Sequence, residues 1–206
     1  MIICGAGGHA RELYQCFKEE FDNIYFFDNI NPITIVEQIP VLKSLDEINA
    51  EFKNDNRFIL GVGGVNARSF LFKQMVEVGG IHLSVCSKNI ITLSFNQKIE
   101  GADIFPYCFL GPDIQIGIGT LINTRSNIHH NSVIGQFCDI APSATLLGGV
   151  VVGDYTFIGG GAMVLPKIKI GNHVTVGAGS VVINDLPDYV TAVGNPAKII
   201  KIGSAV

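Results

Sequence analysis

A repeat of six residues dominates the second half of the chain. Every sixth position from residue 104 to residue 182 is aliphatic, without a miss. These positions are Ile104, Leu110, Ile116, Ile122, Ile128, Ile134, Ile140, Leu146, Val152, Ile158, Val164, Ile170, Val176 and Val182. The next residue of each unit is usually small, and the residue four positions on is usually small or β-branched. Such a fixed period is typical of repeat architectures.

A period of six predicts a parallel β-helix built from hexapeptides. Neither a heptad nor a 3.6-residue α-helix fits this spacing, and the frequent glycines would destabilise an α-helix. Three hexapeptides complete one triangular coil and return the chain to the same side. We therefore expect each aliphatic side chain to point inward and to stack on its equivalents three hexapeptides before and after.

Residues 1–85 follow a different pattern, in which apolar runs alternate with amphipathic segments. Strands are predicted at 1–4, 23–27, 57–60 and 81–85, and helices at 10–20, 45–52 and 66–78. The second of these helices opens on the capping box Ser44–Glu47. The residues expected to face inward are Leu13, Cys16, Phe17 and Phe21 in the first helix and Phe70, Leu71, Met75 and Val78 in the third. Alternating strands and helices predict a parallel sheet.

These patterns predict two domains, a Rossmann-like α/β domain over 1–85 and a β-helical domain over 86–206. Between them, residues 87–103 form a join in which the repeat is irregular. The tail from 184 to 206 contains Pro196, which cannot take part in a central ladder. We expect the tail to leave the coil and cap its end.

Two glycine-rich turns follow predicted strands and precede predicted helices. The segment 5–10 matches G-x-G-x-x-[GA], and Asp28 lies 23 positions after Gly5, near the spacing of a carboxylate that binds ribose hydroxyls. A second turn spans 61–64. Glycines let the backbone approach a phosphate, and the N–H groups that open a helix attract its charge. A nucleotide crevice is expected here, and a tight turn without a ligand is the alternative.

Composition and charge narrow the function. The chain has 206 residues, 48% of them hydrophobic and 16% charged, which is typical of a globular protein. A net charge of −4 without a basic run argues against nucleic acid as a partner. No apolar run is long enough to span a bilayer and no basic leader is present, so neither membrane insertion nor export is expected. The five scattered cysteines are typical of reduced thiols in a cytoplasmic protein. A domain of this size makes only one mononucleotide-sized half, which argues against an NAD dehydrogenase.

One hexapeptide, 128–133, breaks the small-residue rule with two histidines. His130 is at a position that should point away from the core, and Gly148 and Gly149 follow one coil later. We expect an open track along the wall there, with His130 as a general base, because histidine titrates near pH 6.5. His129 is interpreted as either a partly buried orienter or a structural residue. Of the remaining histidines, His9 is expected to face a nucleotide, and His82 and His173 are expected to be ordinary surface or loop residues.

The whole chain resembles the bacterial sugar acyltransferases that join a small nucleotide-binding domain to a left-handed β-helix. This group includes UDP-4-amino-sugar N-acetyltransferases and sialic acid O-acetyltransferases. The stretches that carry the resemblance are the hexapeptides, Gly5–His9, Phe27–Asn29, Gly61–Gly63, Ile122–His130 and Gly194–Lys198. The resemblance implies a left-handed coil, a homotrimer, acetyl-CoA bound along the coil between subunits, and His130 as the base.

The resemblance also implies binding residues. Those near the nucleotide of a nucleotide-linked sugar are Gly5, Gly7, Gly8, His9, Asp28, Asn29, Gly61 and Gly63. Those near coenzyme A are Asp139, Gly148, Gly160, Ala178, Pro196 and Lys198. No metal is expected, because the histidine spacing that β-helical carbonic anhydrases use for zinc is absent.

Two departures from the family pattern affect the acceptor. Asn131 stands where a carboxylate commonly follows the histidine, and Asp139 stands where a second histidine is common. Asparagine can orient an imidazole but stabilises an imidazolium less than a charge would. The predicted function is acetyl transfer from acetyl-CoA to the amine of a nucleotide-linked 4-amino sugar, for bacterial surface glycan biosynthesis. The alternatives are O-acetylation of a sialic acid or another sugar hydroxyl, and a non-catalytic trimeric nucleotide-binding scaffold.

Overall fold

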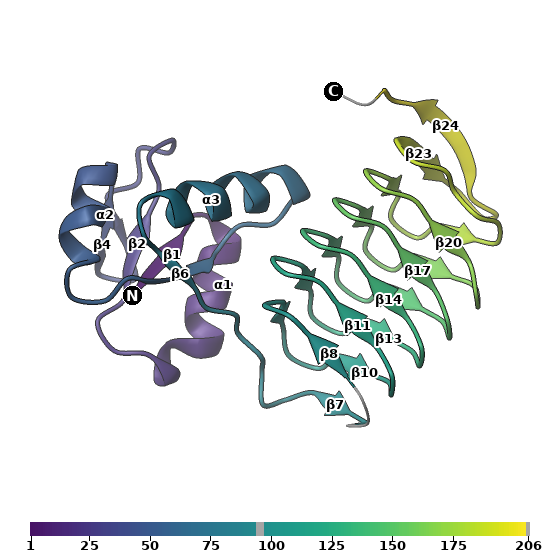
Figure 1. Ribbon diagram of the computed structural model, residues 1–206, viewed down its shortest axis with the longest axis horizontal. Coiled ribbons are helices and arrows are strands. Elements are labelled where there is room, and N and C mark those ends of the chain that lie inside the picture. Colours follow the sequence, from purple (N-terminus) through teal and green to yellow (C-terminus); the bar gives the residue numbers. More distant parts are fainter. Residues whose placement is uncertain (94–96, 205–206) are drawn as a thin grey trace. The chain divides into compact units, whose positions relative to one another are not determined.

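The chain forms two compact units, Met1–Val85 and Cys86–Val206. The computed structural model describes residues 1–93 and 97–204. Residues 94–96 of the expected join and residues 205–206 of the expected tail lie outside the described residues. The first unit is an α/β domain and the second is a coil of very short strands (Figure 1).

The first unit is built on one sheet with the strand order β3-β4-β2-β1-β5-β6. Its strands are β1 (Ile2–Cys4), β2 (Tyr25–Phe27), β3 (Ile35–Val36), β4 (Ile39–Leu42), β5 (Arg57–Leu60) and β6 (Ile81–His82). All neighbouring pairs are parallel except the β3–β4 hairpin, which the sequence patterns did not predict. Because β1 lies between β2 and β5, the two glycine turns emerge side by side at the carboxyl ends of adjacent strands. Ligands of open α/β sheets bind at such a switch point.

Three helices accompany the sheet, α1 (Gly8–Phe17), α2 (Leu45–Glu51) and α3 (Val65–Glu77), with a short 3₁₀ turn at Lys18–Glu20. The predicted capping box of α2 is confirmed, because the Ser44 hydroxyl accepts from the Glu47 N–H at 3.2 Å and the Glu47 carboxylate accepts from the Ser44 N–H.

Two predicted inward positions are wrong. Cys16 is exposed, and Phe70 is 60% exposed. Helix α1 buries Ala10, Leu13 and Phe17 instead, and Cys16 falls outside that stripe. Phe70 lies five residues before the buried Met75, which places the two residues on different sides of an α-helix.

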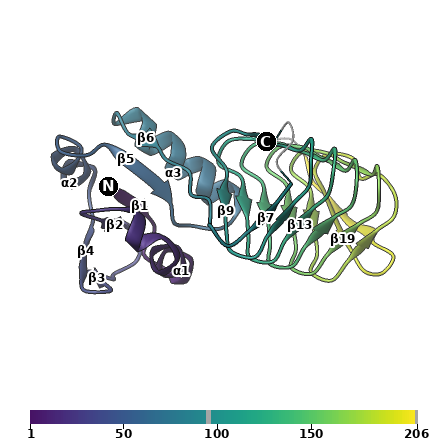
Figure 2. The ribbon, with the colours of Figure 1, turned by 90° about the horizontal axis from the view of Figure 1, so that it is seen from below.

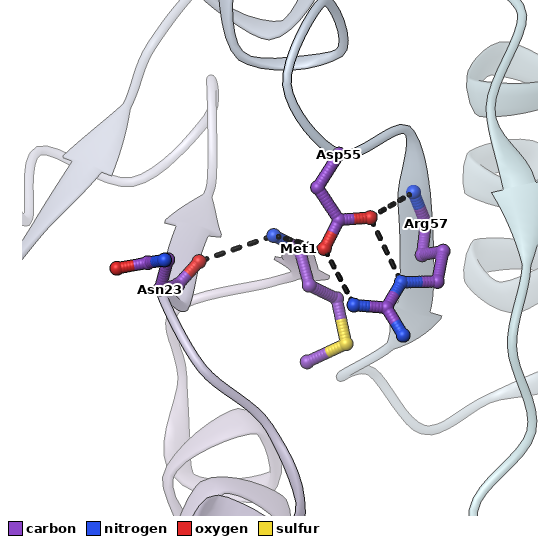
Figure 3. Close-up of polar contacts among 4 residues, drawn as sticks. All are labelled: Met1, Asn23, Asp55 and Arg57. Atoms are coloured by element: carbon purple, nitrogen blue, oxygen red, sulfur yellow. Dashed lines mark hydrogen bonds and ion pairs between the residues drawn. The ribbon is translucent and has the colours of Figure 1, made fainter.

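A charge network closes the amino-terminal edge of this sheet (Figure 3). The Met1 ammonium group donates to the Asn23 carbonyl at 3.1 Å and lies 3.2 Å from Asp55 Oδ2. The Asp55 carboxylate also accepts two hydrogen bonds from the Arg57 guanidinium at 2.8 and 2.7 Å. Hydrogen bonds from Arg57, together with the nearby ammonium group, hold the pKa of Asp55 well below its usual range. The network ties the start of β1 to the start of β5, at the edge away from the glycine turns.

The second unit has one two-residue strand for each hexapeptide. These strands are β9 (Asp103–Ile104), β10 (Phe109–Leu110), β11 (Gln115–Ile116), β12 (Leu121–Ile122), β13 (Asn127–Ile128), β14 (Val133–Ile134), β15 (Asp139–Ile140), β16 (Thr145–Leu146), β17 (Val151–Val152), β18 (Phe157–Ile158), β19 (Met163–Val164), β20 (Lys169–Ile170), β21 (Thr175–Val176) and β22 (Val181–Val182). Two strands of the irregular join, β7 (Ile91–Thr92) and β8 (Lys98–Ile99), precede them.

These strands stack into three parallel faces (Figures 1 and 2). The first face contains β7, β10, β13, β16, β19 and β22, the second contains β8, β11, β14, β17 and β20, and the third runs from β9 through β12, β15, β18 and β21. Residues 104, 122, 140 and 158 are direct partners, as a coil of three hexapeptides requires. All fourteen aliphatic residues of the repeat are at most 2% exposed. The predicted inward stack is confirmed.

Each corner of the coil contains a residue in the left-handed backbone region. Corner 1 follows the first face and has Asp113, Asn131, Gly149 and Lys167 at these positions. Corner 2 follows the second face and has Gly101, Gly119, Phe137, Tyr155, His173 and Tyr189. Corner 3 follows the third face and has Tyr107, Arg125, Ser143, Gly161 and Gly179.

Corner 2 carries a stack of rings. The Phe137 and Tyr155 rings are 5.6 Å apart between centroids, and His173 lies 4.9 Å from both Tyr155 and Tyr189 at interplanar angles of 7°. His173 is exposed in a turn, as the sequence patterns predicted, and it also stacks between the two tyrosine rings. His82 differs from its prediction, because it lies half-buried in β6 and packs edge-on to Phe72 and against Phe58.

The tail continues the coil before it turns back. Strand β23 (Val190–Val193) pairs in parallel with β21 on the third face, and β24 (Lys198–Ile202) then pairs with β23 in the antiparallel direction. The prediction that the tail leaves the coil at residue 184 is wrong by one strand, because Val190 and Ala192 still bury their side chains in the coil's core. Pro196 lies in the turn between β23 and β24, outside any ladder, as expected.

Candidate active site and nucleotide pocket

His130 sits at corner 1, in the turn after β13. The next residue, Asn131, has a φ of 60° and donates its N–H to the Pro112 carbonyl at 3.0 Å. Asparagine tolerates this left-handed conformation better than most residues. The turn places the Asn131 side-chain oxygen 2.8 Å from His130 Nδ1.

This contact selects the histidine tautomer. An amide oxygen only accepts hydrogen bonds, so Nδ1 must carry the proton that it shares with Asn131. In the neutral ring, Nε2 then keeps a lone pair and is the basic nitrogen. The neighbouring amide therefore sets which atom of His130 can take up a proton.

Gly148, one coil later, makes room for the imidazole. A Cβ added to Gly148 would lie 2.5 Å from both Cε1 and Nε2 of His130, far inside normal contact. The sequence pattern suggested that Gly148 and Gly149 leave an open track, but at Gly148 this space contains the His130 ring. Gly149 has a φ of +70°, which favours glycine.

His129 is directed elsewhere. Its ring is half-buried, 5.2 Å between centroids from Phe109 on the first face. Its N–H donates to the Leu146 carbonyl in the regular ladder. Of the two interpretations that the sequence allowed, this packing favours the structural one.

The residues matched to coenzyme A fall at separate places on the coil. Gly160 and Ala178 occupy equivalent positions of corner 3, one coil apart, whereas Gly148 is at corner 1. Asp139 is buried on the third face, and Pro196 and Lys198 are exposed in the tail. Within one chain, the turn that contains Pro196 packs beside the corner of Ala178, because the Val181 carbonyl accepts from the Ala197 N–H at 2.8 Å and the Ser180 hydroxyl accepts from the Gly194 N–H at 3.0 Å. Gly148 and Gly160 are two hexapeptides apart, so the three-hexapeptide period itself places them on different corners.

The first unit contains a cavity of about 370 Å³ at the carboxyl ends of β1, β2 and β5. Its lining is largely apolar and includes Gly5, Phe27, Asp28, Asn29, Ile30, Asn31, Val62, Asn66, Ala67, Phe70 and Leu71. The exposed Phe70 and Ile30 belong to this lining, which accounts for their exposure. Neither residue was predicted to bind a ligand, because Phe70 was assigned to the inward face of its helix and no motif marked Ile30.

The first glycine turn is open where the helix begins. A Cβ added to Gly7 or Gly8 would meet nothing within 4 Å. Gly7 caps α1 and Gly64 caps α3, neither helix has a side-chain cap, and neither has an acidic residue in its first turn. N–H groups in the first turn of a helix favour anions.

Gly5 and Gly61 serve backbone packing instead. Gly61 lies so close to β1 that an added Cβ would be 2.5 Å from Ile3 Cγ2. Gly5 has a φ of +115°, and a Cβ there would be 2.8 Å from the Gly61 carbonyl oxygen. Because Gly5 and Gly61 have no side chains, the two turns can pack closely against each other and against β1. Gly63 is exposed, and His9 is half-buried with Nδ1 3.9 Å from Glu12 Oε2.

Asp28 ends β2 as predicted, but its carboxylate is already occupied. Oδ1 accepts from the N–H groups of Ile30 and Asn31, and Oδ2 accepts from the Asn31 side chain and the Ala6 N–H. Burial raises the pKa of this carboxyl, but the hydrogen bonds from Asn31, Ile30 and Ala6 outweigh that effect and hold the pKa below its usual value.

The described residues support neither a cysteine nucleophile nor a metal site. Burial raises the pKa of Cys108 to about 11 and that of Cys138 to about 12, so neither thiol forms a nucleophilic thiolate at neutral pH. Over residues 1–93 and 97–204, no three His, Cys, Asp or Glu side chains gather as a metal site would require. Within the same residues, no helix has both the length and the apolar character needed to cross a membrane.

Family models match both units. Residues 1–75 match the PglD N-terminal domain, and residues 149–184 match the bacterial transferase hexapeptide of six repeats.

Solved structures match almost the whole chain. A histidine-substituted variant of perosamine N-acetyltransferase from Caulobacter crescentus, solved with CoA and GDP-perosamine, has a TM-score of 0.90 and 29% identity over 97% of this chain and 96% of that one. The acetyltransferase domain of PglB from Neisseria gonorrhoeae, with acetyl coenzyme A, has a TM-score of 0.87 and 26% identity over 97% and 98%. WeeI from Acinetobacter baumannii has a TM-score of 0.80 and 28% identity over 97% and 100%. The expected α/β domain and left-handed β-helix are confirmed.

Proposed function

Because the chain belongs to the hexapeptide-repeat sugar acyltransferases with a PglD-type N-terminal domain, we propose that it transfers an acetyl group from acetyl-CoA to the amine of a nucleotide-linked amino sugar. The observation that carries this proposal is the geometry of His130. Its Nδ1 is held 2.8 Å from Asn131 Oδ1 and its ring lies over Gly148, which leaves Nε2 as a base.

The reaction needs a base and no acyl-enzyme. As the sugar nitrogen attacks the thioester carbonyl, the C–N bond forms, the C–S bond breaks and the nitrogen loses a proton. His130 Nε2 accepts this proton and returns it to the departing thiolate sulfur. A positioned base contributes about 10²–10⁴-fold to such a rate. Acetyl-CoA supplies the activated acetyl group.

A homotrimer is the assembly that we propose. On one chain, His130 and Gly148 are at corner 1, whereas Gly160 and Ala178 are at corner 3. If a neighbouring copy presents its corner 3 beside corner 1, the base and the small-residue wall form one site for acetyl-CoA. Asp139, Pro196 and Lys198 remain candidates for contact with coenzyme A.

The cavity of the first unit is the proposed site for the nucleotide. Its apolar lining suits a nucleobase, and the starts of α1 and α3, which have no side-chain cap, suit phosphates. We place the reaction in the cytoplasm, where acetyl-CoA and nucleotide sugars are available, in the synthesis of a bacterial surface glycan.

The neutral partner of His130 supports a second candidate, O-acetylation of a sialic acid or another sugar hydroxyl. Asn131 stands where the N-acetyltransferases commonly have a carboxylate, and in this respect the site is closer to sialic acid O-acetyltransferases. The rest of the His130 geometry serves either acceptor.

One experiment separates these candidates. The protein is incubated with acetyl-CoA and a panel of nucleotide-linked 4-amino sugars, the matching hydroxy sugars and free sialic acids, and the products are read by mass. We expect a single acetyl group on an amino sugar, and loss of at least about 10²-fold in kcat/KM on His130→Ala with an unchanged assembly state. A product on a hydroxyl would select the second candidate. Absence of acetyl-CoA binding by calorimetry would favour a non-catalytic scaffold.

A further inference from the structure

The loop after β2 is held by a residue outside the cavity. Residues 28–31 all line the cavity, whereas Lys43, just after β4, does not. The Lys43 ammonium group donates to the carbonyl oxygens of Asp28 and Asn31, both at 2.7 Å. One ammonium group therefore links the first and last residues of this loop without lining the cavity.

Lys43 is itself fixed by the start of α2. The Glu47 carboxylate accepts from the N–H groups of both Lys43 and Ser44, and the Ser44 hydroxyl accepts from the Glu47 N–H. The residue before Lys43, Leu42, accepts the Asp28 N–H at 3.1 Å in the sheet. The ammonium group is thus positioned by a capped helix and a β-ladder.

Asp28 binds the same loop from the cavity side. Oδ1 accepts from Ile30 N at 3.0 Å and Asn31 N at 2.9 Å, and Oδ2 accepts from Asn31 Nδ2 at 2.8 Å and Ala6 N at 3.3 Å. A carboxylate has about four acceptor sites, and all of them are used. The contact to Ala6 also joins the loop to the first glycine turn. A ribose hydroxyl would have to displace one of these donors, so the geometry favours an organising role over the ribose contact expected from the sequence.

We propose that Lys43 and Asp28 are positioning residues for the nucleotide, which hold residues 28–31 in the binding conformation before the ligand arrives. This inference rests on the proposed function, since it assumes that the cavity binds a nucleotide. A loop that is already ordered loses less conformational entropy when the ligand binds. Holding the loop in place therefore increases the affinity for the nucleotide. Lys43 acts only through the loop, because it does not line the cavity.

The test compares Lys43→Met, which keeps an unbranched side chain close in length to the apolar part of lysine but removes the ammonium group, with Lys43→Arg, which can still donate to two carbonyls. Lys53→Met is the matched control, because Lys53 is an exposed lysine just beyond α2 that carries the same charge change. The probes are UDP, GDP, CDP and dTDP, titrated by calorimetry into the full chain, with acetyl-CoA titrated separately. Hydrogen exchange of the amides of residues 29–31 reports on the loop.

For whichever of these nucleotides binds the wild-type protein, we expect Lys43→Met to raise the Kd by at least about tenfold. This is the loss expected from charged hydrogen bonds. The same variant should speed exchange at residues 29–31 and leave the Kd of acetyl-CoA unchanged. Lys43→Arg should recover the affinity to within about threefold, and Lys53→Met should behave as wild type.

Two results would overturn the inference. One is an unchanged nucleotide Kd in a variant whose loop exchanges faster, and the other is a weakened Kd without any change in exchange. If wild type binds none of the four probes but still acetylates a free sugar, the inference fails and the acyltransferase assignment stands. If acetyl-CoA does not bind either, the assignment itself fails.

Discussion

Replacing Gly148 by alanine should disable His130 although the histidine itself is not mutated. The added Cβ would lie 2.5 Å from Cε1 and Nε2 of the imidazole, whereas carbon atoms in contact are normally about 3.5–4.0 Å apart. The ring must therefore move by about 1 Å or rotate away from Asn131. A displacement of about 1 Å at a reacting group can cost about 10²-fold in rate, so we expect kcat/KM to fall by about that factor.

The fold should tolerate this change. His130 is exposed and Gly148 is not in the left-handed region, so alanine adds no backbone strain. Gly149→Ala is the contrasting variant, because its φ of +70° disfavours a side chain by about 1–2 kcal/mol. We expect Gly149→Ala to lower the melting temperature and Gly148→Ala to lower turnover.

The assay is release of the CoA thiol at saturating acceptor, with the melting temperature measured on the same samples. The double variant Gly148→Ala/His130→Ala completes a double-mutant cycle. If Gly148 acts only by making room for the ring, the double variant should be no slower than His130→Ala alone. Turnover of Gly148→Ala within about threefold of wild type would refute the assigned base geometry. So would additive losses in the cycle.

Four further predictions address the neighbouring contacts and the two units. Asn131→Ala should lower kcat about tenfold by releasing Nδ1, and Asn131→Asp should retain activity with the acid limb of the pH–rate profile moved to higher pH. Gly61→Ala should destabilise the first unit by about 1–3 kcal/mol in urea unfolding, because its Cβ would meet Ile3, and an unchanged midpoint would contradict this packing. Ile128→Ala should destabilise the coil by about 2–5 kcal/mol in the same assay. The pKa of Asp55 is lowered by folding, so its contribution to stability is present above about pH 4 and is lost as the pH falls further; Asp55→Asn should flatten that acid dependence in thermal melts between pH 3 and pH 7.

The coil was predictable because its information is local. Each inward side chain follows from its place in a hexapeptide, and the partner of Ile122 at Ile140 follows from counting three hexapeptides. The same count placed Gly148 beside His130. What it could not provide is which side chain fills the space between them, because that depends on the rotamer of His130 and on its bond to Asn131.

The α/β unit shows a different limit. The glycine turns and the capping box were visible because their residue types have few other uses, but the sides on which Phe70 and Cys16 lie depend on what packs around each helix. The occupied carboxylate of Asp28 depends on Ala6, 22 residues away, and the loop's second anchor is Lys43, 15 residues away. No pattern of neighbouring residues predicts either contact.

The pairing of each hexapeptide with the third one after it has a consequence for how such a protein can change length. Each coil contacts only the coils directly above and below it, as in other solenoids. The His130–Gly148 pair spans one such step, so a whole coil of three hexapeptides inserted or removed beyond Lys167 would leave that step intact. A partial coil inserted there would instead move every later residue to a different face or corner. The coil can therefore become longer or shorter by whole coils of three hexapeptides without changing the contact between His130 and Gly148.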